Sequence, residues 1–133
     1  DLLVGEDIDL WFRILQKSKA VFINRPLYAY RQHPTSLMHN DNRVNEGLVV
    51  THVRNYERVQ QLLSFSQKIK YRRRVATHLF DFGYQLRLKG ENAQARGAYL
   101  QSFVWYPQVG TVLAWFKSLL PISMIAVRRC GND

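Results

Sequence analysis

Two periodicities of apolar and polar positions divide the chain. From Gly5 to about residue 16, apolar residues recur at helical spacing, which predicts a short helix. The apolar face of this helix consists of Leu10, Trp11, Ile14 and Leu15. Two extended segments follow, Ala20–Ile23 and Leu27–His33, and Arg25-Pro26 separates them. The first forty residues therefore predict one helix and a short β pair.

Beyond residue 41 the pattern is helical. We expect helices over Val44–Ser66, over about Ser66–Lys89 and over about Asn92–Trp105. Gly90 is a favourable residue just past a helix end, and Pro107 stops the third helix. The predicted fold is mainly α with a short β pair, and its second part holds three or four helices.

Residues 76–107 match the spacing of a tetratricopeptide-like helical hairpin, a repeat of about 34 residues. The matching positions are Leu79, Phe82, Gly83, Leu86, Ala95, Tyr99, Ser102 and Pro107. Gly83 and Ala95 are small enough to let two antiparallel helices approach closely. A single unit cannot build a solenoid, so it packs on neighbouring helices or further repeats lie outside this chain. A packing role is favoured over peptide capture.

The segment Val109–Val127 has one charged residue, Lys117, and Arg128-Arg129 follows it. Its length would allow a membrane span, but Pro121 and three hydroxyl residues argue against one. A helix packed on the rest of the protein is favoured. A helix lying on a membrane surface is the second alternative.

Charge is distributed unevenly over the 133 residues, whose net charge is +9. Residues 1–45 carry six Lys/Arg and five Asp/Glu, whereas residues 46–133 carry thirteen and five. The densest basic cluster is Lys68, Lys70, Arg72, Arg73 and Arg74. On a helix these side chains spread around the circumference, which favours a solvated surface. The second alternative is that the cluster binds an anionic membrane or a lipid-linked pyrophosphate, and the third is that it binds nucleic acid.

The cysteine count and the histidine spacing bear on disulfide bonds and metal sites. The single cysteine, Cys130, rules out an internal disulfide and a Cys-x-x-Cys zinc site. His39, His52 and His78 show no metal-ligand spacing with one another.

Two motifs stand in order near the start of the chain. Gly5-Glu-Asp-Ile-Asp-Leu-Trp-Phe-Arg13 is followed, after a gap, by Asn24-Arg-Pro-Leu-Tyr-Ala-Tyr-Arg-Gln-His-Pro-Thr-Ser36. Together they resemble the C-terminal end of the catalytic domain of family 2 glycosyltransferases, which have the GT-A fold. The resemblance implies that residues 1–40 are the last part of such a domain and that 41–133 form a helical C-terminal region. Because the chain opens without Met or a secretory pattern, we expect it to be a fragment of a longer protein.

The resemblance implies transfer of a sugar from a nucleotide-diphosphate sugar to an acceptor hydroxyl, with inversion, in surface polysaccharide or glycoconjugate synthesis. Asp7 resembles the catalytic base, and Glu6 its supporting carboxylate. Arg31 would contact the diphosphate and Trp11 the acceptor or sugar. His33 would complete the coordination of Mg²⁺ or Mn²⁺.

Each of these residues also has a purely structural interpretation. Asp7 is a common type of first-turn acid, and Trp11 suits a core or a pocket wall. Arg31 suits an ion pair, and His33 suits a strand-end residue bonded to backbone. Asp7-Ile-Asp9 has the letters of an Asp-x-Asp metal site, but it lies within the predicted helix, so we do not assign it as one.

The main metal ligands and the nucleotide pocket are expected in a missing N-terminal half, so this chain alone should be inactive. The expected partners are the sugar donor and a glycan or lipid-linked acceptor, with peripheral membrane contact through the basic helices and residues 109–129. The expected location is cytoplasmic, at the inner face of the cell membrane. The rival functions are a tetratricopeptide-type interaction module and a basic nucleic-acid-binding domain.

Overall fold

The described part of the protein is entirely α-helical. A computed structural model describes residues 5–29, 31 and 41–120, and within these ranges it contains five helices and no strand. The helices are α1 (Glu6–Leu15), α2 (Asp41–Val59), α3 (Phe65–Leu88), α4 (Asn92–Trp105) and α5 (Val109–Lys117). The mainly α prediction is confirmed at this level.

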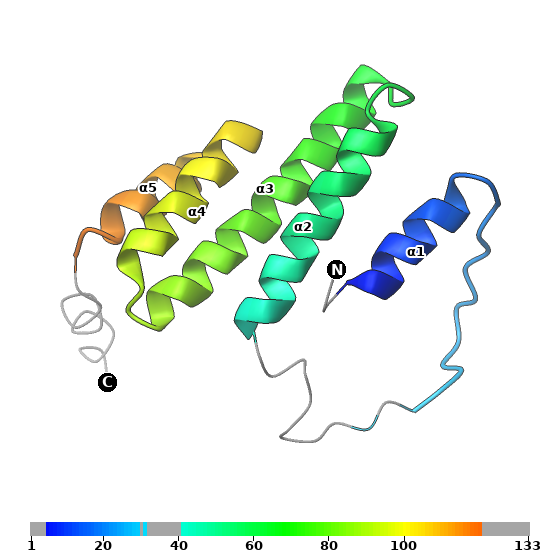
Figure 1. Cartoon of the computed structure of the whole chain (residues 1–133), viewed down its shortest axis with the longest axis horizontal. Helices are drawn as coiled ribbons and strands as arrows, with labels where there is room; N and C mark the ends of the chain where they lie inside the picture. Colours follow the sequence, from blue (N-terminus) through cyan, green and yellow to red (C-terminus); the bar gives the residue numbers. More distant parts are fainter. Residues whose placement is uncertain (1–4, 30, 32–40, 121–133) are drawn as a thin grey trace.

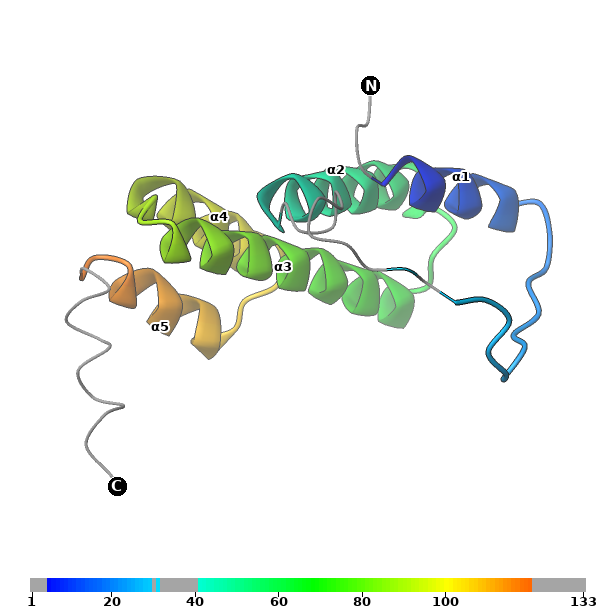
Figure 2. The same cartoon turned by 90° about the horizontal axis from the view of Figure 1, so that it is seen from below.

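The helices form an open succession. Each packs mainly on the helix that follows it in sequence: α1 on α2, α2 on α3, α3 on α4, and α4 on α5 (Figures 1 and 2). Short connections after α2, α3 and α4 make these neighbours antiparallel. Since α1 and α5 are the two ends of the succession, each keeps one side that the other described helices do not cover.

Local sequence signals set the ends of α3. Ser64 and Gln67 form a capping box, in which the Ser64 hydroxyl accepts from the Gln67 N–H and the Gln67 side chain accepts from the Ser64 N–H. At the other end Gly90 adopts φ 83°, and the Glu91 N–H donates to the Leu86 carbonyl at 2.9 Å. This Schellman-type closure confirms Gly90 as the residue that ends the helix. The helix expected to run to Ser66 ends earlier, at Val59.

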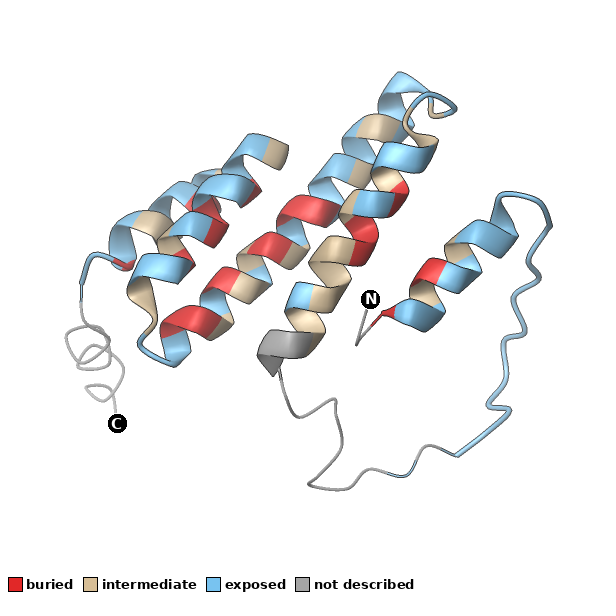
Figure 3. Ribbon diagram, viewed as in Figure 1, coloured by how far each residue is buried: buried red, intermediate tan, exposed pale blue. Residues whose placement is uncertain are grey.

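The most extensive packing joins α3 to α4, and buried positions lie along both helices (Figure 3). The buried apolar side chains are Val75, Ala76, Leu79, Leu86, Ala95, Ala98 and Tyr99. A Cβ added at Gly83 would lie 2.8 Å from the Tyr99 ring, so the helices are as close as a glycine allows. The Ser102 hydroxyl donates to the Ala76 carbonyl across the same interface at 2.7 Å. The antiparallel helix pair predicted over 76–107 is therefore present.

The predicted β pair is wrong for the described residues. Positions 20–29 and 31 form no strand, and the rest of the second segment, His33 included, lies outside the described part. Val21, Phe22 and Tyr28 are more than four-fifths exposed. A strand needs a partner for its backbone groups and a surface for its side chains, and a lone pair of strands is marginal in water. An alternating pattern of apolar and polar residues supplies neither the backbone partner nor the surface.

The expectation for the last segment is confirmed as far as it is described. α5 packs on α4, and Thr111 and Ser118 on its inner side are buried. Within the described residues, no helix has the length and hydropathy needed to cross a bilayer. Positions 121–129 lie outside the described part.

Candidate functional site at the start of helix α1

Gly5 fixes where α1 begins against α2. It adopts φ 88°, a left-handed conformation that side chains other than glycine rarely tolerate. A Cβ at this position would also lie 2.7 Å from the Thr51 hydroxyl oxygen, and that hydroxyl donates to the Gly5 carbonyl at 3.4 Å. Both the backbone conformation and the close approach therefore require glycine at the first residue of the motif.

Asp9 is the buried anchor of α1. Its Oδ1 accepts hydrogen bonds from Arg58 and from Asn55 Nδ2, the latter at 3.1 Å, and its Oδ2 lies 3.3 Å from Arg13 Nε. Burial acts to raise the pKa of Asp9. Hydrogen bonds from Arg58 and Asn55 and the charges of Arg58 and Arg13 outweigh that effect and lower the pKa. The carboxylate thus stays ionised and ties α1 to α2.

Glu6 and Asp7 lie in the first turn of α1 and are exposed. Asp7 Oδ1 accepts from the Ile8 N–H at 2.8 Å. Within the described residues neither carboxylate forms a salt bridge. The prediction that Asp7 lies at a helix start is confirmed. Its role in catalysis stays a prediction.

The apolar stripe of α1 points away from the described helices. Trp11 is 59% exposed, and Leu10, Ile14 and Leu15 are all more than 40% exposed. The side that packs on α2 carries Asp9 and Phe12 instead. Trp11 is therefore not a core residue of the described part. Arg31 is exposed, and His33 lies outside the described residues, so its distance from Asp7 stays untested.

An aromatic and histidine cluster lies behind this site. The rings of His52 on α2 and His78 on α3 stack with centroids 4.5 Å apart. Phe12 reaches the His52 ring edge-on at 5.6 Å, and Tyr71 lies 6.2 Å from it. Sequence spacing gave no sign of this cluster, because its members come from three helices.

Burial and positive charge set the protonation of the two histidines. Burial lowers the pKa of His52 to about 4, with smaller effects from the charges of His78 and Arg74. Burial and Arg74 also lower the pKa of His78, although Asp81 opposes them. Both rings are consequently neutral near pH 7.

The described residues do not make up a metal site. They contain no group of three or more His, Cys, Asp or Glu side chains that could hold an ion. Asp9 is already bonded to Arg58, which agrees with leaving Asp7-Ile-Asp9 unassigned as a metal motif. The expected Mg²⁺ or Mn²⁺ therefore rests on His33 and on residues outside this chain.

Several arginines bind helix ends. Arg72 donates to the carbonyls of Val104 and Trp105 at the end of α4, at 3.1 and 2.9 Å. Arg87 donates to the Lys117 carbonyl and Arg96 to the Ser118 carbonyl at the end of α5. These three arginines are thus divided between the ends of two helices, which argues against their forming part of a single basic face.

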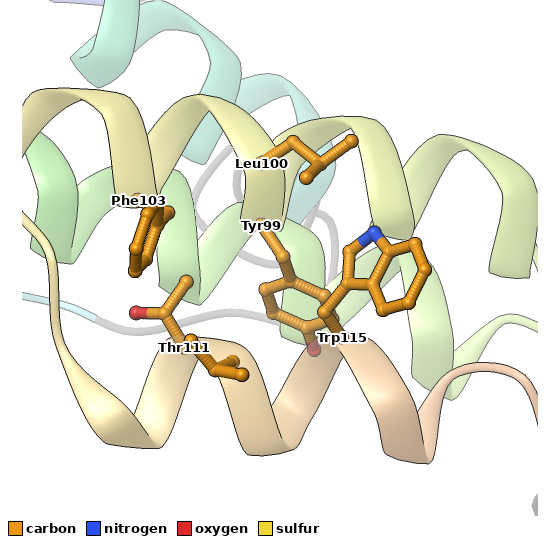
Figure 4. Close-up of a pocket in the computed structure, with 6 residues that line it drawn as sticks. Tyr99, Leu100, Phe103, Thr111 and Trp115 are labelled. Carbon is orange, nitrogen blue, oxygen red and sulfur yellow. The ribbon is translucent and has the colours of Figure 1, made fainter.

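Two hollows lie away from α1. One of about 210 Å³ lies between α4 and α5 (Figure 4); its lining is Tyr99, Leu100, Phe103, Thr111, Val112 and Trp115. Another of about 150 Å³ is lined by Thr77, Phe80, Gln108, Gly110 and Thr111. Both are smaller than the roughly 300 Å³ at which ligand pockets usually begin. Neither suits a nucleotide sugar.

Comparison with protein-family models, curated proteins and solved structures finds no match to this chain. The resemblance of residues 5–36 to family 2 glycosyltransferases therefore stays a prediction from the sequence.

Proposed function

We propose that this chain is the C-terminal end of the catalytic domain of an inverting glycosyltransferase, followed by a helical region. The observation that carries the proposal is the division of roles among the carboxylates of α1. Asp9 is buried and held by Arg58 and Asn55. Asp7, two residues earlier, is exposed at the helix start and is free to meet a substrate.

In the proposed reaction Asp7 is the general base. It takes the proton of the acceptor hydroxyl while that oxygen forms a bond to the anomeric carbon of the donor sugar. The bond from the anomeric carbon to the diphosphate breaks on the opposite side, and the nucleoside diphosphate leaves with the electron pair. Gly5 and Asp9 position the base, and Glu6 contacts the acceptor.

The exposed apolar side of α1 supports this proposal. Trp11, Leu10 and Ile14 form a contiguous apolar stripe, and Val21 and Phe22 add nearly fully exposed side chains after it. Apolar surface of this kind marks an interaction site more often than a free surface. In the proposal the rest of the catalytic domain covers this side, and Trp11 lines the acceptor pocket.

The proposal limits the chemistry of this chain to proton transfer and positioning. Arg31 is assigned to diphosphate oxygens and His33 to the metal, following the resemblance. The described residues contain no group of three or more metal-ligating side chains.

The test is Asp7→Asn in the longer enzyme. Because the amide keeps the shape but cannot accept the proton, transfer should fall by about 10²- to 10⁴-fold while donor binding is retained. Turnover and donor affinity are measured together, and the unmodified 133-residue chain should show no transfer. Wild-type turnover in Asp7→Asn, or activity in the isolated chain, would contradict the proposal.

The rival functions have weaker support. A tetratricopeptide-type module needs an open groove along the 76–107 hairpin, and the two hollows that residues of the hairpin line are only about 210 and 150 Å³. A nucleic-acid-binding domain needs its bases gathered on one face, whereas Arg58, Arg72 and Arg87 bind at three separate places.

A further inference from the structure

The outer side of α5 forms an exposed apolar surface, here called the α5 face. Its residues are Val109, Leu113, Phe116 and Leu120, and they are 49–78% exposed. The four on or just after α5 recur at intervals of four, three and four residues, so they form one stripe. Within the described residues, the proposed function makes no use of this stripe.

The stripe lies on the wrong side of α5 for packing within the described chain. Thr111 and Ser118, on the inner side, are buried, and Ala114 and Trp115 pack against the α3–α4 core. A helix that is apolar on its outer side as well normally has a second partner.

The charges around the stripe indicate the kind of surface that would cover it. From Asn92 to Asn132 the sequence contains no Asp or Glu. Lys117 lies at the C-terminal end of the stripe, and Arg72 is bonded to the carbonyls of Val104 and Trp105, shortly before α5 begins. An apolar stripe with basic residues near it and no acids in this part of the sequence complements a surface that is apolar inside and negative outside.

We propose that the α5 face rests on an anionic lipid membrane. The stripe enters the boundary between headgroups and acyl chains, and Lys117 contacts lipid phosphates. A second copy of the chain is a poorer partner, because pairing the same face would bring like charges together. A peptide is poorer too, because a docked peptide needs a groove and the hollow beside Leu100 and Phe103 holds only about 210 Å³ (Figure 4). The inference does not depend on the glycosyltransferase proposal.

The first test is vesicle flotation of the whole chain. Vesicles of phosphatidylcholine alone are compared with vesicles containing about one-third phosphatidylglycerol. Binding to the anionic vesicles should be about tenfold tighter or more and should weaken as salt rises, since basic residues contribute to it. Equal binding to both vesicles, or none, overturns the proposal.

The second test uses matched substitutions. Leu113→Ser with Phe116→Ser removes the centre of the stripe, whereas Leu62→Ser with Phe65→Ser removes exposed apolar side chains at the distant turn between α2 and α3 (Figure 1). The first pair should weaken binding to anionic vesicles by about tenfold or more. The second pair should leave it unchanged.

Two readouts keep these variants interpretable. Circular dichroism establishes that each pair keeps the helix content of the wild type. Sedimentation equilibrium without lipid should give a monomer. Equal losses of binding in both pairs overturn the proposal. A dimer that Phe116→Ser dissociates also overturns it, and assigns the face to a second copy.

Discussion

The joint between α1 and α2 and the joint between α3 and α4 hold helices together by opposite means. The first depends on a buried carboxylate, Asp9, bonded to Arg58 and Asn55, and leaves an apolar stripe of α1 open. The second depends on small residues and the buried ring of Tyr99, packed directly on Gly83. The first joint sets the position of a helix, whereas the second supplies most of the buried apolar packing of the described chain.

Tyr99→Ala should break the second joint and have the largest effect. The side chain is 1% exposed, and its removal leaves a cavity against Gly83 and Phe80. We expect the free energy of unfolding to fall by about 3–5 kcal/mol. Urea denaturation followed by circular dichroism measures this loss.

Tyr84→Ala is the matched control, because Tyr84 lies on α3 and is 48% exposed. It should cost about 1 kcal/mol or less. Similar losses in the two variants would mean that the α3–α4 packing does not dominate stability.

Asp9→Asn should break the first joint without unfolding the second. The amide cannot form the ion pairs with Arg58 and Arg13, and the docking of α1 should weaken by about 2–3 kcal/mol. Because the loss is local, trypsin should cleave faster after Arg13 and Lys17 while the urea midpoint changes little.

Asp7→Asn is the control for this experiment, since Asp7 is exposed and lies two residues away on the same helix. Its proteolysis should match the wild type. Rapid cleavage in both variants would show that α1 is held by something other than the Asp9 anchor.

Lowering the pH should destabilise the protein through the stacked histidines His52 and His78. Because the pKa of His52 is lowered to about 4 in the folded state, the unfolded chain binds more protons between about pH 6.5 and 4. The contribution of His52 to the free energy of unfolding is complete above about pH 6.5 and is lost as the pH falls from about 6.5 to 4. Unfolding free energy should drop by about 1–2 kcal/mol between about pH 7 and pH 5.

His52→Phe separates this titration from the others. Phenylalanine keeps an aromatic ring against Phe12, Tyr71 and His78 but has no group to protonate. The drop over the same pH range should become smaller without vanishing, since His78 still titrates with a lowered pKa. An unchanged profile would exclude His52 as a source of the pH dependence.

Local sequence signals predicted the ends of helices, whereas contacts between helices far apart in the chain left no signal in the sequence. The bounds of α4 are as expected, because Gly90 and Pro107 punctuate the chain on either side. Asp7 was placed at a helix start by the same kind of signal. The Asp9 anchor was missed because Arg58 lies 49 residues away on another helix, and periodicity carries no information about which helices meet. The β pair failed because a strand requires partners that the described residues do not supply.

The mildest substitution examines how close α3 and α4 must be. A Cβ at Gly83 would lie 2.8 Å from the Tyr99 ring, whereas one at Gly97 on α4 would meet nothing within 4 Å. Alanine favours a helix over glycine by about 1 kcal/mol, so Gly97→Ala should raise the free energy of unfolding by up to that amount. At Gly83 the same gain is outweighed by the clash, and we expect a net loss of about 1 kcal/mol. Opposite signs in urea denaturation would establish direct helix contact at Gly83, and a stabilising Gly83→Ala would contradict it.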